Sequence, residues 1–302
     1  MGVALGLGAA LSWGLADYFA AVASRSVGAL RVVLGFHLAA LIPLTVLVLA
    51  TDALARVSIT QVAVFVLIGA VGWVSYLAFY GALAIGPISV LSPIVSGYAA
   101  VTVLLAVVFA GSRLSALEAV AVGTTISGAM LASADIREIA RANLQRRSAL
   151  GFVLALCAMA LLGAFVFGVS YYRQRIGWLA PIFLARGFAA LFVLGHVLAA
   201  RGADPTGAGG ADPVEVGAHR TRPRRTAVAL MMLLALLDTG GYVCFNLGVG
   251  YASAAIVAAA SAPYAIVPIA MGVSLFGERP TRAQWLGVGF VIAGVIVLGA
   301  VT

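Results

Sequence analysis

The sequence predicts an all-α membrane protein with ten transmembrane helices, built as two inverted five-helix repeats. Three observations predict this fold class: the composition, the length of the apolar runs and an internal repeat. Of the 302 residues, 63% are hydrophobic and 9% are charged, whereas about a quarter of a soluble domain is charged. Lipid accepts apolar side chains all around a helix, so this composition indicates a lipid bilayer around the chain.

The basic balance of the chain also fits a membrane. The formal net charge is +8, and all 18 basic residues are arginines. Nearly all of them lie between apolar runs, which is typical of residues that flank transmembrane helices. A nucleic-acid-binding protein would gather them in one patch, so we expect no nucleic-acid partner.

Ten apolar runs of about twenty residues follow one another along the chain, and this is the length of helix that crosses a bilayer. The predicted spans are residues 2–22, 31–50, 60–83, 87–110, 116–134, 148–171, 178–200, 227–249, 253–276 and 283–301. An even number of spans places both termini on the same side of the membrane.

Two connections are long enough to have a character of their own. Residues 135–147 place apolar residues at helical spacing among arginines, which predicts a short interfacial helix. Residues 201–226 are rich in Gly, Ala and Pro and predict a flexible loop. The predicted organisation is a first repeat over residues 1–134, the linker 135–147, and a second repeat over residues 148–302 that contains this loop.

The repeat appears when the two halves are compared at an offset of 166 residues. Matching residues at this offset are Tyr76 and Tyr242, Phe79 and Phe245, Tyr98 and Tyr264, Gly111 and Gly277, Arg113 and Arg279, Gly123 and Gly289, and Gly128 and Gly294. Each half holds five spans, an odd number, so the second half enters the membrane from the opposite side. The halves are therefore predicted to be inverted repeats.

Helix-breaking residues occupy matched places in the fourth and ninth spans. Pro93 and Gly97 lie in the fourth span, Pro263 and Pro268 lie in the ninth, and the offset pairs Gly97 with Pro263. Such residues free backbone groups that need partners inside a membrane. Interrupted helices in corresponding positions indicate a transporter binding site, and kinks that serve only packing are the alternative. Polar side chains near these breaks are candidate substrate contacts: Ser92, Ser96, Tyr98, Ser261, Tyr264, Tyr76, Tyr242 and Asn246.

Ionisable residues within the spans are the other candidates, because a charge at bilayer depth costs several kcal/mol unless it is paired or hydrated. Asp17 follows Trp13 by one helical turn, so both project from one face. Asp238 lies opposite Gly72 in the repeat and is the first candidate for a carboxylate that couples transport to protons. Arg186 would hold either Asp238 or a substrate carboxylate, and a purely structural pair of the two is the alternative.

Several function classes can be weighed from the same residues. A chain without Lys cannot form the phosphate-binding loop of an ATP-driven pump. No His-Glu-x-x-His or Gly-x-Ser-x-Gly motif is present, so we predict no enzyme, no metal site and no cofactor. A structural or receptor-like protein would not explain acids beside broken helices. The pattern therefore favours a secondary transporter of a small-molecule substrate.

Short motifs in both halves carry a resemblance to a known family. They are Ser12-Trp13-Gly14, Leu30-Arg31, Ser261-Ala262-Pro263 and Gly277-Glu278-Arg279-Pro280. With them the chain resembles, over nearly its whole length, the EamA family of the drug/metabolite transporter superfamily. The first half departs from the pattern, since Gly111-Ser112-Arg113 carries Ser where the family usually has Glu. This departure removes a symmetric role for that acidic residue.

The resemblance implies ten helices in two inverted repeats, and transport of amino acids and related metabolites, commonly outward, across the cell membrane. It also implies a cytoplasmic amino terminus, whereas the distribution of arginines alone favours the opposite orientation. One chain holds both halves, so a monomer is expected, with a homodimer as the alternative. An exporter of organic cations is the alternative function: Asp17 beside Trp13 suits a cation, while an amino acid would also need an Arg.

Overall fold

The computed structural model describes residues 1–85, 91, 94–133, 146–203, 224–267 and 281–301. Helices and turns make up this part of the chain, which contains no strand. The helices are α1 (Gly2–Val27), α2 (Ala29–Leu49), α3 (Ile59–Ile85), α5 (Tyr98–Ala110), α6 (Ala116–Ser133), α8 (Arg146–Tyr171), α9 (Arg173–Ile176), α10 (Leu179–Ala203), α11 (Arg224–Gly248), α12 (Ala254–Ser261), the 3₁₀ helix η1 (Ala262–Ala265) and α14 (Arg282–Val301).

Each of the ten predicted spans contains a helix, and the differences lie mainly at the ends. α10 ends at Ala203 and α11 begins at Arg224, so both helices reach into the stretch predicted as the loop 201–226. Most of that loop and most of the predicted linker 135–147 lie outside the described residues. The candidates Ser92, Pro93 and Pro268 lie outside them as well.

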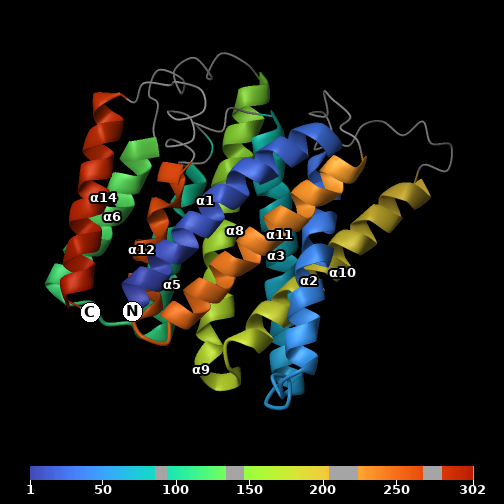
Figure 1. Ribbon diagram of the computed structural model, residues 1–302, viewed down its shortest axis with the longest axis horizontal. Helices are drawn as coiled ribbons and strands as arrows, with labels where there is room; N and C mark the ends of the chain where they lie inside the picture. The colour runs from blue at the N-terminus through green and yellow to red at the C-terminus, as the bar shows by residue number, and fades with distance from the viewer. Residues whose placement is uncertain (86–90, 92–93, 134–145, 204–223, 268–280, 302) are drawn as a thin grey trace.

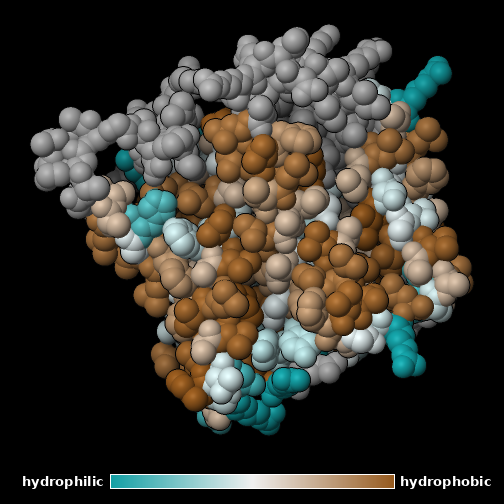
Figure 2. Space-filling view, turned by 180° about the vertical axis from the view of Figure 1, so that it is seen from behind, coloured by the Kyte–Doolittle hydropathy of each residue, from teal (hydrophilic) through white to brown (hydrophobic). Residues whose placement is uncertain are grey.

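Among the residues that the structure describes, six helices are long and apolar enough to cross a membrane, namely α1, α2, α3, α8, α10 and α11, and shorter apolar helices accompany them. Large apolar side chains on their outer faces are exposed, for example Leu67 of α3 and Leu236 of α11, 66% and 67% exposed. A soluble protein would bury such a surface. Figure 2 shows brown apolar residues over the flank of the bundle and teal residues toward its ends. The chain is an integral membrane protein.

The bundle is long in one direction, with α6 and α14 side by side at one end and α10 toward the other (Figure 1). Between them, α1 packs along α11, and α3 packs along α8. The two ends of the chain lie near each other at the same end of the helices (Figure 1). Gly28 allows α2 to follow α1 almost without a loop, since its φ of 88° is accessible to Gly and strained for other residues.

The pair α6 and α14 shows how small residues let helices approach closely in a membrane. A Cβ atom built on Gly128 would lie 2.8 Å from the backbone nitrogen of Val291, and one on Gly294 would lie 2.9 Å from the backbone nitrogen of Thr125. Real Cβ atoms do not approach other atoms so closely. Backbone stands against backbone here, so neither contact can be relieved by turning a side chain.

We therefore expect Gly128→Ile to lower the stability of the folded protein by about 1–3 kcal/mol or more, as overpacking does in a close-packed core. The matched control is Gly123→Ile on the same helix, where an added Cβ would meet nothing within 4 Å. The measurement is the melting temperature of each purified variant in detergent. Equal melting temperatures for the two variants would contradict the close contact of α6 and α14.

Candidate functional site

A cavity with about 400 Å³ of empty space lies between the helices and is lined mostly by aromatic side chains. Its walls are formed by Trp13 and Asp17 of α1, Tyr76, Phe79 and Tyr80 of α3, Tyr98 of α5, Leu162 and Val166 of α8, Asp238 and Tyr242 of α11, and Tyr264 of η1. Both halves of the chain contribute to it.

Trp13 forms one wall of the cavity. Its ring packs edge-on against Tyr242 and Tyr98, with centroids 5.0 and 5.9 Å away, and its Nε1 donates a hydrogen bond to the backbone oxygen of Asp238 at 3.1 Å. The ring fits because α11 presents Gly241 to it: a Cβ there would lie 2.5 Å from Cδ1 of Trp13. The close approach of α1 and α11 therefore depends on Gly241 and fixes the position of the ring.

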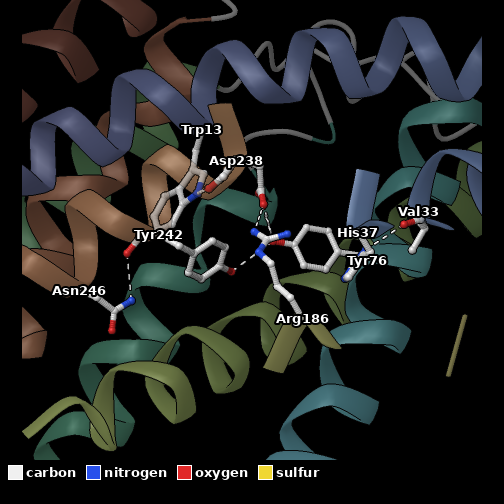
Figure 3. A network of polar contacts seen from close by, with 8 residues as sticks. All are labelled: Trp13, Val33, His37, Tyr76, Arg186, Asp238, Tyr242 and Asn246. Carbon is white, nitrogen blue, oxygen red and sulfur yellow. Dashed lines mark hydrogen bonds and ion pairs between the residues drawn. The ribbon is translucent and has the colours of Figure 1, made fainter. Parts of the chain in front are cut away.

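Asp238 is held by two partners at the cavity (Figure 3). Its carboxylate forms an ion pair with Arg186 of α10 and accepts a hydrogen bond from the Tyr76 hydroxyl at 3.1 Å. The hydroxyls of Tyr76 and Tyr242 lie 3.3 Å apart. Both members of the ion pair are almost fully buried, with 5% of Asp238 and 1% of Arg186 exposed.

Arg186 makes this pair from behind the wall of the cavity. Its guanidinium lies over the rings of Phe36 and Tyr242, with Cζ 5.5 and 5.1 Å from their centroids, a geometry that stabilises a desolvated cation. Arg186 does not appear among the residues that line the cavity. Of the two partners expected for Arg186 from the sequence, the structure shows Asp238. His37 lies close by, edge-on to Tyr76, with Nδ1 2.8 Å from the Val33 oxygen of its own helix (Figure 3).

Asp17 differs from Asp238 in its surroundings. It is 6% exposed and lines the cavity beside Trp13. Within the part of the chain that the structure describes, its Oδ2 has no hydrogen-bond partner, and no ion pair is seen for it. The site thus combines one carboxylate neutralised by an arginine with a second carboxylate that has no charged partner among the described residues.

Tyr98 and Tyr264 are related by the repeat, and their rings contact each other on the wall of the cavity, with centroids 5.7 Å apart. Ser261 donates a hydrogen bond to the Ala258 oxygen at 2.8 Å, so its own oxygen accepts from the Tyr98 hydroxyl, also at 2.8 Å. Ser261 therefore positions Tyr98 and does not line the cavity.

The matched helix breaks are present at Gly97 and Pro263. Gly97 lies at the N-cap of α5, at a turn that interrupts the helical residues on either side. Pro263 lies where the α-helix α12 tightens into the 3₁₀ helix η1, since Pro has no N–H for the α-helical hydrogen bond. Both breaks place a tyrosine, Tyr98 or Tyr264, directly after them on the wall of the cavity.

Other candidates from the sequence lie away from the wall. Ser96 is buried, with 1% exposed. Asn246 is fully buried and donates a hydrogen bond to the Tyr242 oxygen of its own helix at 3.0 Å. Neither residue lines the cavity.

Four lining residues were not expected as part of the site: Phe79, Tyr80, Leu162 and Val166. Tyr80 lies one helical turn after Tyr76, and that spacing could have indicated it. The apolar residues of α8 carry no signal, because Leu and Val suit a lipid-facing surface equally well. Among the residues that the structure describes, no three His, Cys, Asp or Glu side chains gather as ligands for a metal.

Comparison with known proteins identifies a family. The model of the EamA-like transporter family matches residues 1–134 and 149–300. No curated protein matches the chain. Among solved structures 26 chains match, and one, described as "Crystal structure of protein", has a TM-score of 0.70 and 13% sequence identity over 99% of this chain and 96% of that chain. At this identity the likeness shows a shared fold.

Proposed function

Since the chain belongs to the EamA-like transporter family, in the drug/metabolite transporter superfamily, we propose that it is a secondary transporter that carries small metabolites through the cavity described above. The observation that carries this proposal is the cavity itself: its walls come from both halves of the chain and hold a carboxylate, Asp17, whose Oδ2 has no partner among the described residues. Intramembrane ionisable residues that face such a cavity are typical of transport pathways.

We propose ten transmembrane helices in two inverted five-helix repeats, over residues 1–134 and 148–302. The way the helices pack supports this arrangement. α1 packs on α11 as α8 packs on α3, and α1 packs on α12 as α8 packs on α5. Exchange of the two halves turns each of these contacts into its counterpart. The alternating directions of successive helices in Figure 1 also agree with it.

Individual residues support the same arrangement. Tyr76 meets Tyr242 and Tyr98 meets Tyr264, and each pair is related by the 166-residue offset. The close contacts between α6 and α14 obey the same offset: it relates Gly128 to Gly294, and it relates their respective contacts Val291 and Thr125 to each other. Residues related by an inverted repeat meet in this way around a two-fold axis in the membrane plane.

In this proposal the two repeats rock against each other and expose the cavity to one side of the membrane at a time. Protons are the proposed coupling ion. Asp238 was the first candidate for the coupling carboxylate, but Arg186 and Tyr76 already hold it. We therefore assign a structural role to the pair of Asp238 and Arg186, and proton exchange to Asp17. We propose a monomer in the cell membrane as the functional unit, with export as the direction.

Tyr98→Ala and Tyr264→Ala are each expected to weaken substrate binding several-fold to about 30-fold, because an aromatic contact in a desolvated site contributes about 0.5–2 kcal/mol. Membrane insertion should remain intact. The measurement is the substrate concentration that gives half-maximal transport in proteoliposomes. Tyr251→Ala is the matched control, since Tyr251 is 65% exposed and lies outside the cavity. Parental transport of every substrate by both cavity variants would show that the substrate path is elsewhere.

A further inference from the structure

We propose that the cavity selects small monovalent organic cations of the quaternary ammonium type, with Asp17 as the counter-charge and the surrounding rings as the walls. This inference rests on the transport function proposed above and specifies its substrate class. It is carried by the charges at the cavity and by the chemistry of its walls.

Of the charged groups at the cavity, Asp17 has no positively charged partner among the described residues. Asp238 and Arg186 neutralise each other. Asp17 lines the cavity while nearly fully buried, and its Oδ2 has no partner in the described part of the chain. A buried carboxylate without a partner is costly in a membrane, and a bound cation or a proton removes that cost. A single unpaired carboxylate therefore favours a monovalent cation over a neutral or anionic substrate.

The walls suit an organic cation. Seven aromatic residues line the space: Trp13, Tyr76, Phe79, Tyr80, Tyr98, Tyr242 and Tyr264. The negative face of an aromatic ring attracts a cation, and cages of such rings recognise quaternary ammonium groups. A metal ion would instead need several oxygen or nitrogen ligands.

A zwitterionic amino acid fits this distribution of groups less well. Its carboxylate would need a cationic partner on the wall. The nearby guanidinium belongs to Arg186, which is bound to Asp238, covered by Phe36 and Tyr242, and absent from the residues that line the cavity. The carboxylate of an amino acid would also face Asp17, a group of the same charge.

The test measures ligand-induced stabilisation of the full-length protein in detergent, because a ligand that binds only the folded state raises the melting temperature. The probes are tetramethylammonium and leucine. The variants are Asp17→Asn, which keeps the size and removes the charge, Asp17→Glu, which keeps the charge, and Asp52→Asn as a control, since Asp52 is exposed on the connection between α2 and α3.

Tetramethylammonium should raise the melting temperature of the parent, Asp17→Glu and Asp52→Asn, and its affinity for Asp17→Asn should fall by at least about tenfold, a change of about 1.4 kcal/mol. Leucine should have no such effect. Without ligand, Asp17→Asn should be at least as stable as the parent, because it removes a buried charge without breaking an ion pair. If this variant fails to fold, the substrate class is still tested by comparing the two probes on the parent and on Asp17→Glu.

Two results would overturn the proposal in distinguishable ways. If leucine stabilises the parent and tetramethylammonium does not, and leucine transport is unchanged in Asp17→Asn, the substrate class is wrong while transport through the cavity stands. If neither probe binds and no solute of any class crosses proteoliposomes that contain the parent protein, the transport function fails together with the substrate class.

Discussion

Asp238→Asn is expected to lower the stability of the folded protein by about 3–5 kcal/mol, the cost of leaving one member of a buried ion pair without its partner. Arg186 is 1% exposed and its guanidinium is bound to the Asp238 carboxylate. Asparagine keeps the size of the side chain and removes its charge, so a buried cation would remain uncompensated. The measurement is thermal unfolding in detergent, with Asp52→Asn as the control for loss of a carboxylate in an exposed position.

The double variant Asp238→Asn with Arg186→Met should recover most of that stability, because it removes both charges and keeps the volume. This recovery separates a structural ion pair from a coupling carboxylate. A stable Asp238→Asn protein that binds substrate and no longer responds to a pH gradient would contradict the structural assignment. Proton coupling would then return from Asp17 to Asp238.

Val166→Trp is expected to abolish transport by filling the cavity from α8. Val166 lines the cavity and is 3% exposed, so a large ring at this position has no outlet to lipid. Overpacking should also lower the stability of the folded variant by about 1–3 kcal/mol. Uptake into proteoliposomes is the measurement, normalised to the amount of folded protein recovered after reconstitution.

Val153→Trp is the matched control for this substitution. Val153 lies on the same helix and is 54% exposed on its outer face, where lipid accommodates a Trp. Transport by Val153→Trp should equal that of the parent. Parental transport rates in folded Val166→Trp would show that substrate does not pass through this cavity.

The sequence predicts the helices well because a segment that crosses a bilayer must be a long apolar run. Apolar runs of about twenty residues locate the helices to within a few residues at most ends. The observed helix ends differ from the predicted ones at a few places. α1 continues to Val27 because Gly28 makes the turn, and arginines at 201 and 224 belong to the ends of α10 and α11.

The candidate site could be predicted in part because the repeat places equivalent residues at equal depth. Tyr76 and Tyr242, and likewise Tyr98 and Tyr264, lie on the wall together with Trp13 and Asp17. Hydropathy and the repeat do not indicate the direction in which a side chain points about its helix. For that reason Ser96, Ser261 and Asn246 were expected at the cavity and lie behind it, whereas Leu162 and Val166 of α8 were not expected and line it.

The pairing of acids and bases also depended on the three-dimensional arrangement. The sequence allows two partners for Arg186, Asp238 or a substrate carboxylate, and does not choose between them. The packing of α10 against α2 and α11 brings Arg186 to Asp238, and Asp17 has no ion-pair partner in the described part of the chain. The roles proposed for the two carboxylates follow from this difference.

The central claim is that the chain is a secondary transporter whose substrate passes through the aromatic cavity. It is tested most directly by solute flux into proteoliposomes, with a panel of metabolites and organic cations, with and without a pH gradient, for the parent and for Val166→Trp. We expect a saturable flux through the parent without any nucleotide, a response of that flux to the pH gradient, and loss of the flux in Val166→Trp. A parent flux no greater than that of protein-free vesicles, for every solute in the panel, would contradict it.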